Sequence, residues 1–166
     1  MAYIITDAIA GNQPIATTST VKNHPLGKIV TAKDPTYGEA EFIYLTGVAN
    51  TVAGSWAVFD DIDGATKLLA AGHVGPVGIA MSANVASQYG WYMIHGLHSS
   101  AQAWTSLSMA TGAILYATAS AGIVDDAVVS GDRIYRATVD TAKVTAVATV
   151  AVVINRPEVT NEDPTA

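Results

Sequence analysis

The chain has 166 residues, of which half are hydrophobic and 13% are charged, and its formal net charge is −6. This length is typical of one domain, and the apolar content is ample for a core. The eight Lys and Arg residues form no cationic cluster of the kind that a phosphate backbone requires, which argues against nucleic-acid binding. The absence of cysteine excludes disulfides, thiolate catalysis and Cys-ligated zinc.

The sequence predicts neither a secretion signal nor a membrane span. The N-terminal residues, MAYIITD, lack a basic segment followed by a long apolar core. Gly, Ser, Asn, Gln and Pro interrupt every candidate run of about 18 apolar residues. We therefore expect no membrane partner.

One long segment, 68–124, contains no Asp, Glu, Lys or Arg. A chain of this size buries only about 68–70% of its unfolded surface, and solvent usually meets charged side chains. We therefore expect part of this segment to be covered by other subunits.

Residues 1–23 show neither helical nor strand periodicity, and they are interrupted by Gly11, Asn12 and Pro14. One interpretation is a disordered terminus. The interpretation we favour is an extended arm that orders on a neighbouring subunit, because a solvated tail has no use for large apolar side chains. Those side chains are Tyr3, Ile4 and Ile5.

A run of strands is predicted from His24 onward. Residues 28–32 and 41–45 flank the turn sequence KDPTYG, a pattern that predicts a hairpin, and the second strand is apolar on both faces. Residues 56–59 and 66–69 form a further predicted pair. The intervening DDIDG resembles the start of a calcium loop, but no Glu follows at the required spacing, so a plain hairpin turn is preferred.

The segment from Tyr89 to Gly96 is the most aromatic predicted strand. The two-residue period of a strand places Tyr89, Trp91, Met93 and His95 on one face and Tyr92 with Ile94 on the other. Neither face is polar, so we expect one to pack on the core and the other to contact a subunit, where Tyr and Trp are enriched. The residues predicted to contact other protein chains are Tyr3, Ile4, Ile5, Tyr89, Trp91, Tyr92 and Trp104.

Further strands are predicted at 79–81, 113–117, 132–137 and 144–154, the last because eight of its eleven residues are β-branched. With eight to ten short strands and no convincing helix, the sequence predicts an all-β fold: a single compact sandwich or barrel with an extended N-terminal arm. The predicted division is an arm at 1–23, a β-rich domain at 24–157 and an acidic tail at 158–166.

The residues that commonly carry catalysis do not assemble into a recognisable pattern. His95 and His98 are three apart, which on a strand places them on opposite faces, and no nearby carboxylate completes a metal shell. No Gly-x-Ser-x-Gly sequence is present. Asp60-Asp61 and Asp125-Asp126 fall in predicted turns. We therefore expect a protein that is not an enzyme and has no cofactor.

Several segments between residues 24 and 130 carry a resemblance to capsid decoration, or cement, proteins of tailed bacteriophages. These segments are HPLG (24–27), AKDPTYGE (32–39), EFIYL (41–45), GVA (47–49), GPV (75–77), SQYGWY (87–92), LYATA (115–119) and GIVDDA (122–127). The resemblance does not extend to the residues before His24 or after about Val139.

The resemblance implies a small β-rich virion protein, often a homotrimer, that sits on the outer capsid surface and cements the major capsid protein. It would be made in the host cytoplasm and would need a self-association surface and a second surface for the shell. Two alternatives remain: another β-structured virion or binding module, such as a carbohydrate-binding sandwich, and, least favoured, an enzyme. A carbohydrate binder would expose Trp91 and Trp104 in a groove.

Overall fold

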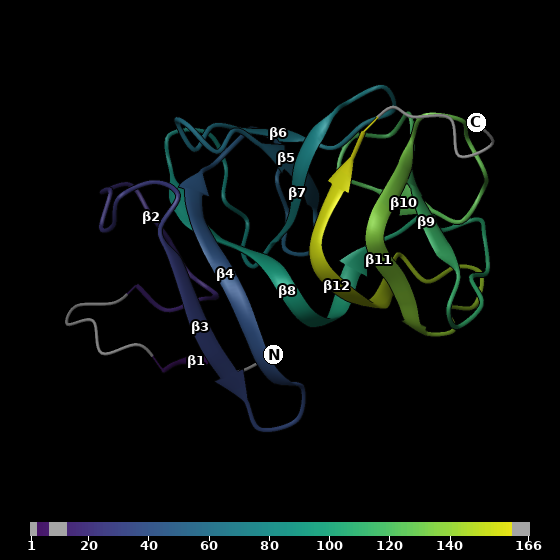
Figure 1. Ribbon diagram of the computed structural model, residues 1–166, viewed down its shortest axis with the longest axis horizontal. Helices are drawn as coiled ribbons and strands as arrows, with labels where there is room; N and C mark the ends of the chain where they lie inside the picture. Colours follow the sequence, from purple (N-terminus) through teal and green to yellow (C-terminus); the bar gives the residue numbers. More distant parts are fainter. Residues whose placement is uncertain (1–2, 7–12, 161–166) are drawn as a thin grey trace.

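The computed structural model describes residues 3–6 and 13–160, and this part of the chain contains strands and loops but no helix. Twelve strands join in one antiparallel sheet that does not close into a barrel and resembles a β-sandwich (Figure 1). The strands are β1 (Ile4–Ile5), β2 (Thr18–Ser19), β3 (Ile29–Asp34), β4 (Gly38–Thr46), β5 (Trp56–Phe59), β6 (Thr66–Leu68), β7 (Gly75–Ala80), β8 (Tyr89–Gln102), β9 (Ile114–Ala117), β10 (Val124–Asp125), β11 (Arg133–Thr141) and β12 (Thr149–Val159). The predicted all-β class is confirmed.

The β3–β4 hairpin forms at the predicted place because its turn chemistry is strong. Asp34 Oδ1 accepts the main-chain N–H groups of Thr36 at 2.7 Å and Tyr37 at 3.1 Å. Gly38 has φ 80°, a conformation that glycine adopts without steric penalty. The turn therefore sets a register in which Ile29 lies opposite Ile43.

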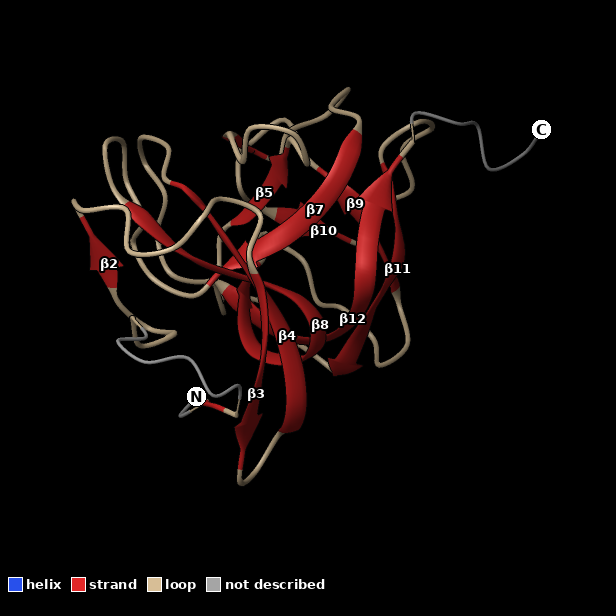
Figure 2. Cartoon of the chain, turned by 60° about the vertical axis from the view of Figure 1, so that its left-hand side comes forward, coloured by secondary structure: helices blue, strands red, loops and turns tan. Residues whose placement is uncertain are grey.

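Strand β8 links the two halves of the molecule. Its first half pairs with β4, and its second half pairs with β12 (Figures 1 and 2). The change of direction occurs at Gly96, whose φ is 114°. A Cβ atom at Gly96 would lie 2.7 Å from the Cβ of Ala40, so only glycine fits there.

Strands β7, β8 and β12 pair with one another in all three combinations. Ile79 of β7 lies opposite Met93 of β8, β8 meets β12 at His95, and β12 returns to β7 at Gly75. The strands diverge between these three contacts. The divergence leaves a depression in the face of the sheet.

Both faces of the central strands are buried within the single chain. The larger hydrophobic cluster contains Trp56 and Trp91, whereas Ile43, Tyr92 and Ile94 belong to a second cluster on the other face. The predicted separation of the β8 side chains into two faces is confirmed. However, the side chains on both faces are covered largely by the protein's own chain, so this part of the uncharged segment does not need another subunit to shield it. For the exposed residues of the segment, such as Val74 and Trp104, shielding by other subunits stays a prediction.

The last strand differs from its prediction at both ends. Residues 144–148 form a turn rather than strand: Ala146 has φ 74°, and its N–H donates to Thr105 O. At the other end the strand continues through Pro157 to Val159. The proline is tolerated because it lies between ladder pairs, at a bulge. Glu158 therefore belongs to the sheet and not to a tail; residues 161–166 lie outside the described part.

The described parts of the predicted arm pack on their own domain. Strand β1 pairs with β3, and β2 pairs with β8. Gln13 and Ile15 are buried. The expectation that this segment orders only on a neighbour is therefore wrong for residues 3–6 and 13–23, while residues 1–2 and 7–12 lie outside the described part.

Candidate interaction surface

Two of the predicted contact residues, Trp91 and Tyr92, are fully buried inside the subunit. Trp91 lies against Tyr44, with ring centroids 4.9 Å apart. Tyr92 lies in the second cluster, where its hydroxyl accepts a hydrogen bond from the Asn84 side chain at 3.3 Å. The assignment of Trp91 and Tyr92 to a subunit contact is therefore wrong: their side chains form the two cores that β8 separates.

The remaining aromatic of this strand, Tyr89, is half-buried because the N-terminal segment covers it. Gln13 makes this possible: its side-chain amide donates to the main-chain oxygens of Thr17 at 2.8 Å and Tyr89 at 3.1 Å. Its oxygen accepts from the Tyr44 hydroxyl at 2.8 Å and from Asn23 at 3.0 Å. A buried amide that uses both its donor and acceptor groups fixes this segment on the domain.

Tyr3, Ile4 and Ile5 lie on the outer edge of β3. The Tyr3 hydroxyl donates to Leu97 O at 2.8 Å, and its ring packs edge-on against Phe42. Burial, followed by the nearby charge of Asp34, raises the pKa of Tyr3 to about 12. Ile4 points away from the domain with 70% of its surface exposed, so this edge offers an apolar side chain to a partner.

Trp104 lies at the other end of the molecule and is 36% exposed. It borders a shallow depression of about 350 Å³ whose lining includes Val129, Asp125 and Asp132. Burial raises the pKa of Asp125 above its usual value. Trp104 is thus the one predicted tryptophan that an outside molecule can reach.

His98 and two aspartates of the β5–β6 turn form hydrogen bonds to the main chain. His98 is buried, and burial lowers its pKa to about 4, so its neutral ring accepts the Ser100 N–H at 3.2 Å. The predicted hairpin turn between β5 and β6 is confirmed. Among residues 3–6 and 13–160, no group of three or more His, Cys, Asp or Glu side chains could hold a metal ion.

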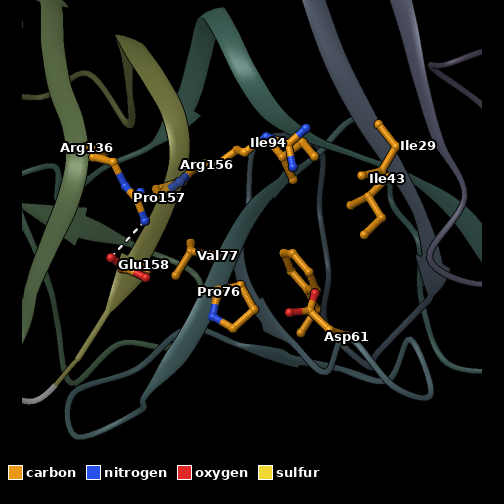
Figure 3. Close-up of a pocket in the computed structure, with 11 residues that line it drawn as sticks. Ile29, Ile43, Asp61, Pro76, Val77, Ile94, Arg136, Arg156, Pro157 and Glu158 are labelled. Atoms are coloured by element: carbon orange, nitrogen blue, oxygen red, sulfur yellow. Dashed lines mark ion pairs between the residues drawn. The ribbon is translucent and has the colours of Figure 1, made fainter.

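The depression between β7, β8 and β12 has a volume of about 190 Å³ and an apolar floor. Isoleucines from β3 and β4 lie on one side of it, and charged side chains from β11 and β12 lie on the other (Figure 3). We call it the β8 pocket; it is lined by Ile29, Ile43, Phe59, Asp61, Pro76, Val77, Ile94, Arg136, Arg156, Pro157 and Glu158.

Two ion pairs form the polar rim of the β8 pocket. Arg136 binds Glu158 and Arg156 binds Glu41, each at 2.7 Å. Both guanidinium groups are about half exposed, at 52% and 54% of their side-chain surfaces. Because each guanidinium carries five N–H donors, both retain hydrogen-bonding capacity for an outside group.

A single bulge places both arginines on this rim. One residue of β11, Arg136, lies opposite three of β12, 155–157. Arg136 has φ 58° and Arg156 has φ 49°, in the left-handed region that non-glycine residues rarely adopt. This conformation costs about 1–3 kcal/mol per residue, whereas an exposed ion pair contributes about 0.2–1 kcal/mol. The intrachain pairs alone do not offset the strain.

The β8 pocket continues into a second, wider depression of about 660 Å³. The two share Phe59, Asp61 and Pro76. The wider depression also includes Val74 and Ile62, both strongly exposed. Together they form a continuous surface with an apolar centre and a charged rim, which is the anatomy of a protein interface.

Comparison with protein-family models, curated proteins and solved structures found no significant match for this chain. In the part of the chain that the structure describes, no helix is long and apolar enough to cross a membrane.

The β8 pocket was not predicted from the sequence, because it draws residues from seven strands and the β5–β6 turn. Only two features of the sequence point toward this surface. Ile62 stands among three aspartates in a turn, where a polar residue is usual, and Arg156-Pro157 breaks the alternation of the last strand.

Proposed function

We propose that this protein binds the outer surface of a tailed-bacteriophage capsid as a homo-oligomer, a trimer by resemblance, and cements the major capsid protein without catalysis. The observation that carries the proposal is the apolar, charge-rimmed surface made by the β8 pocket and the adjoining depression. A binding role needs such a surface on a rigid framework, and the doubly buried strands provide that framework.

The segments that carry the resemblance support the same proposal by their positions. AKDPTYGE and EFIYL form the β3–β4 hairpin, GPV begins β7, and SQYGWY leads into β8. These strands build the two hydrophobic clusters, so the resemblance concerns the framework of the fold rather than scattered surface residues.

The shell contact is assigned to the edge formed by β1. Ile4 is exposed on β1, the terminal strand of the sheet among residues 3–6 and 13–160, and the outer edge of a terminal strand can bind another chain. This assignment keeps self-association, on the β8 face, separate from attachment to the shell. Cementing by many copies gains affinity through avidity even when each contact is weak.

Co-sedimentation with capsids of the phage whose genome encodes the chain tests this proposal. Purified protein is mixed with capsids stripped of accessory proteins, and the pelleted fraction is measured against protein concentration. We expect saturable binding that Ile4→Asp weakens and that Val21→Asp, a matched change at another exposed site, leaves unchanged. Protein that stays in the supernatant at every concentration overturns the proposal.

Carbohydrate binding is the second candidate, and Trp104 is the observation that favours it. An exposed indole beside the carboxylates Asp125 and Asp132 can stack on a sugar ring and accept its hydroxyl hydrogens. Tryptophan fluorescence during titration with a panel of oligosaccharides tests this candidate. A saturable change that Trp104→Ala abolishes would favour it over the capsid role.

A further inference from the structure

The turn between β5 and β6 projects an apolar side chain into solvent. Ile62 is 96% exposed, the highest value among the large apolar residues that the structure describes. Asp60 Oδ1 accepts the Ile62 N–H at 2.7 Å, and Asp63 Oδ1 accepts the Ala65 N–H at 2.8 Å. These bonds shape the turn, and they leave the second oxygen of each carboxylate beside Ile62 available to other donors.

The β8 pocket next to this turn matches such a projection in size and chemistry. Its volume of about 190 Å³ exceeds that of a cavity of about 150 Å³ that holds a benzene molecule, so it accommodates one isoleucine side chain. Its floor of Ile43, Ile94 and Phe59 is apolar. Its rim carries the guanidinium groups of Arg136 and Arg156.

We propose that Ile62 of one copy of the chain enters the β8 pocket of a second copy. The aspartates of the turn then lie beside the half-exposed arginines of the rim. Glu158 and Asp61 line the same pocket, so the incoming carboxylates bind through the guanidinium N–H groups that the intrachain ion pairs leave free. This inference rests on the self-association part of the proposed function and names the surface that makes it.

The positions of Ile62 and the β8 pocket determine where a symmetry axis would lie. Asp61 lines the pocket and directly precedes Ile62, so projection and pocket adjoin on one face. The symmetry axis therefore passes close to Phe59 and Pro76, which line both depressions. A two-fold axis makes the contact reciprocal, and a three-fold axis repeats it around a ring.

Disulfide trapping tests which residues meet, and the absence of native cysteine makes it specific. Ile62→Cys protein is mixed with Ile29→Cys protein of a different tagged mass, because Ile29 lines the pocket and is partly exposed. Under mild oxidation we expect a mixed dimer of the two masses. The control pair replaces Ile29→Cys with Val128→Cys, at an exposed residue outside the pocket, and should give at least about tenfold less product.

Sedimentation velocity then measures the contribution of the contact. Ile62→Asp should raise the dissociation constant for self-association about tenfold to a hundredfold, because it removes a buried isoleucine. Val128→Asp should leave it unchanged. Since both side chains are exposed, unchanged circular dichroism is expected for both variants.

A monomeric wild-type protein at high concentration, or an oligomer that Ile62→Asp leaves intact, overturns this inference. Absence of the mixed disulfide dimer does the same. Co-sedimentation with capsids tests shell binding separately, because a single subunit can still bind the shell through the β1 edge. A monomeric wild-type protein that co-sediments would overturn this inference and the homo-oligomer part of the proposed function, and would leave shell binding standing.

Discussion

The indole N–H of Trp91 donates a 2.9 Å hydrogen bond to the main-chain oxygen of Gln13, which lies 78 residues earlier in the chain. One buried side chain thus joins the centre of β8 to the N-terminal segment. The ring also packs against Tyr44 and against His24, whose centroid is 5.3 Å away. Trp91 therefore holds together parts of the chain that are distant in sequence.

We predict that Trp91→Ala lowers the free energy of unfolding by about 3–5 kcal/mol, because it leaves a large cavity and an unpaired carbonyl. Urea denaturation followed by circular dichroism measures the change. Trp104→Ala, at a partly exposed site, should cost less than about 1 kcal/mol. A Trp91→Ala protein with unchanged stability but a lost oligomer would contradict this assignment.

Gly96→Ala is expected to destabilise the fold more than an exposed glycine substitution does. The new Cβ would meet the Ala40 Cβ at 2.7 Å, at a φ of 114° that L-residues rarely adopt. The cost should exceed about 1–3 kcal/mol, because steric overlap adds to backbone strain. Thermal melting measures it, with Gly72→Ala as the control, since Gly72 has positive φ but no atom near the added Cβ.

The Ala40→Gly background separates the two contributions. Removing the Ala40 methyl removes the 2.7 Å overlap with a new side chain at residue 96 but leaves the φ strain and the 3.1 Å contacts with the residue 40 Cα and Glu39 O. We therefore expect Gly96→Ala to cost less in Ala40→Gly protein than in wild type. An identical cost in both backgrounds would show that the contact is unimportant.

Stability should fall as the solution is acidified from about pH 6.5 toward pH 4, because of His98. Burial lowers the pKa of the folded-state ring to about 4, whereas an unfolded histidine titrates near 6.5. Between these values the unfolded state binds a proton that the folded state does not. The free energy of unfolding therefore decreases as pH falls, by about 3 kcal/mol at pH 4 from this group.

His98→Asn removes the titration and retains an acceptor for the Ser100 N–H, so its unfolding free energy should depend less on pH over this range. Urea denaturation at several pH values measures the slopes, and NMR titration of the wild-type ring should give a midpoint near 4. Equal slopes for the two proteins would assign the acid sensitivity to other groups.

Replacing Arg136 or Arg156 with glycine should change stability by no more than about 1 kcal/mol. Glycine relieves the strained φ at each position but loses a half-exposed ion pair and adds chain entropy in the unfolded state. Chemical denaturation measures this balance. A loss of several kcal/mol would show that the ion pairs hold the bulge together, and would remove the reason to assign the guanidinium groups to a partner.

Local patterns predicted the fold class and most strands. The sequence KDPTYG between a β-branched run and an apolar run identified the β3–β4 hairpin, and the run WAVF coincides with β5. The alternation from Tyr89 separated two faces that the structure confirms. These features depend on residues that are close together in the sequence, so a single sequence is enough to predict them.

The prediction failed where distant residues decide the structure. Tyr92 was assigned to a subunit contact because its face is apolar, but its side chain is fully buried within the same chain, in a cluster with residues of β4, β5 and β7. Val144 lies in a strand-like run, yet it belongs to a turn. The preceding Lys143 is buried, where its ammonium group donates to Trp104 O at 2.7 Å and holds that loop in place.

Strand β8 belongs to both halves of the sheet, because Gly96 lets one continuous backbone turn from β4 toward β12. No interdomain linker consequently separates the two halves, because one uninterrupted strand supplies ladder hydrogen bonds to both. Unfolding of either half removes pairing partners from the strand on which the other half is built.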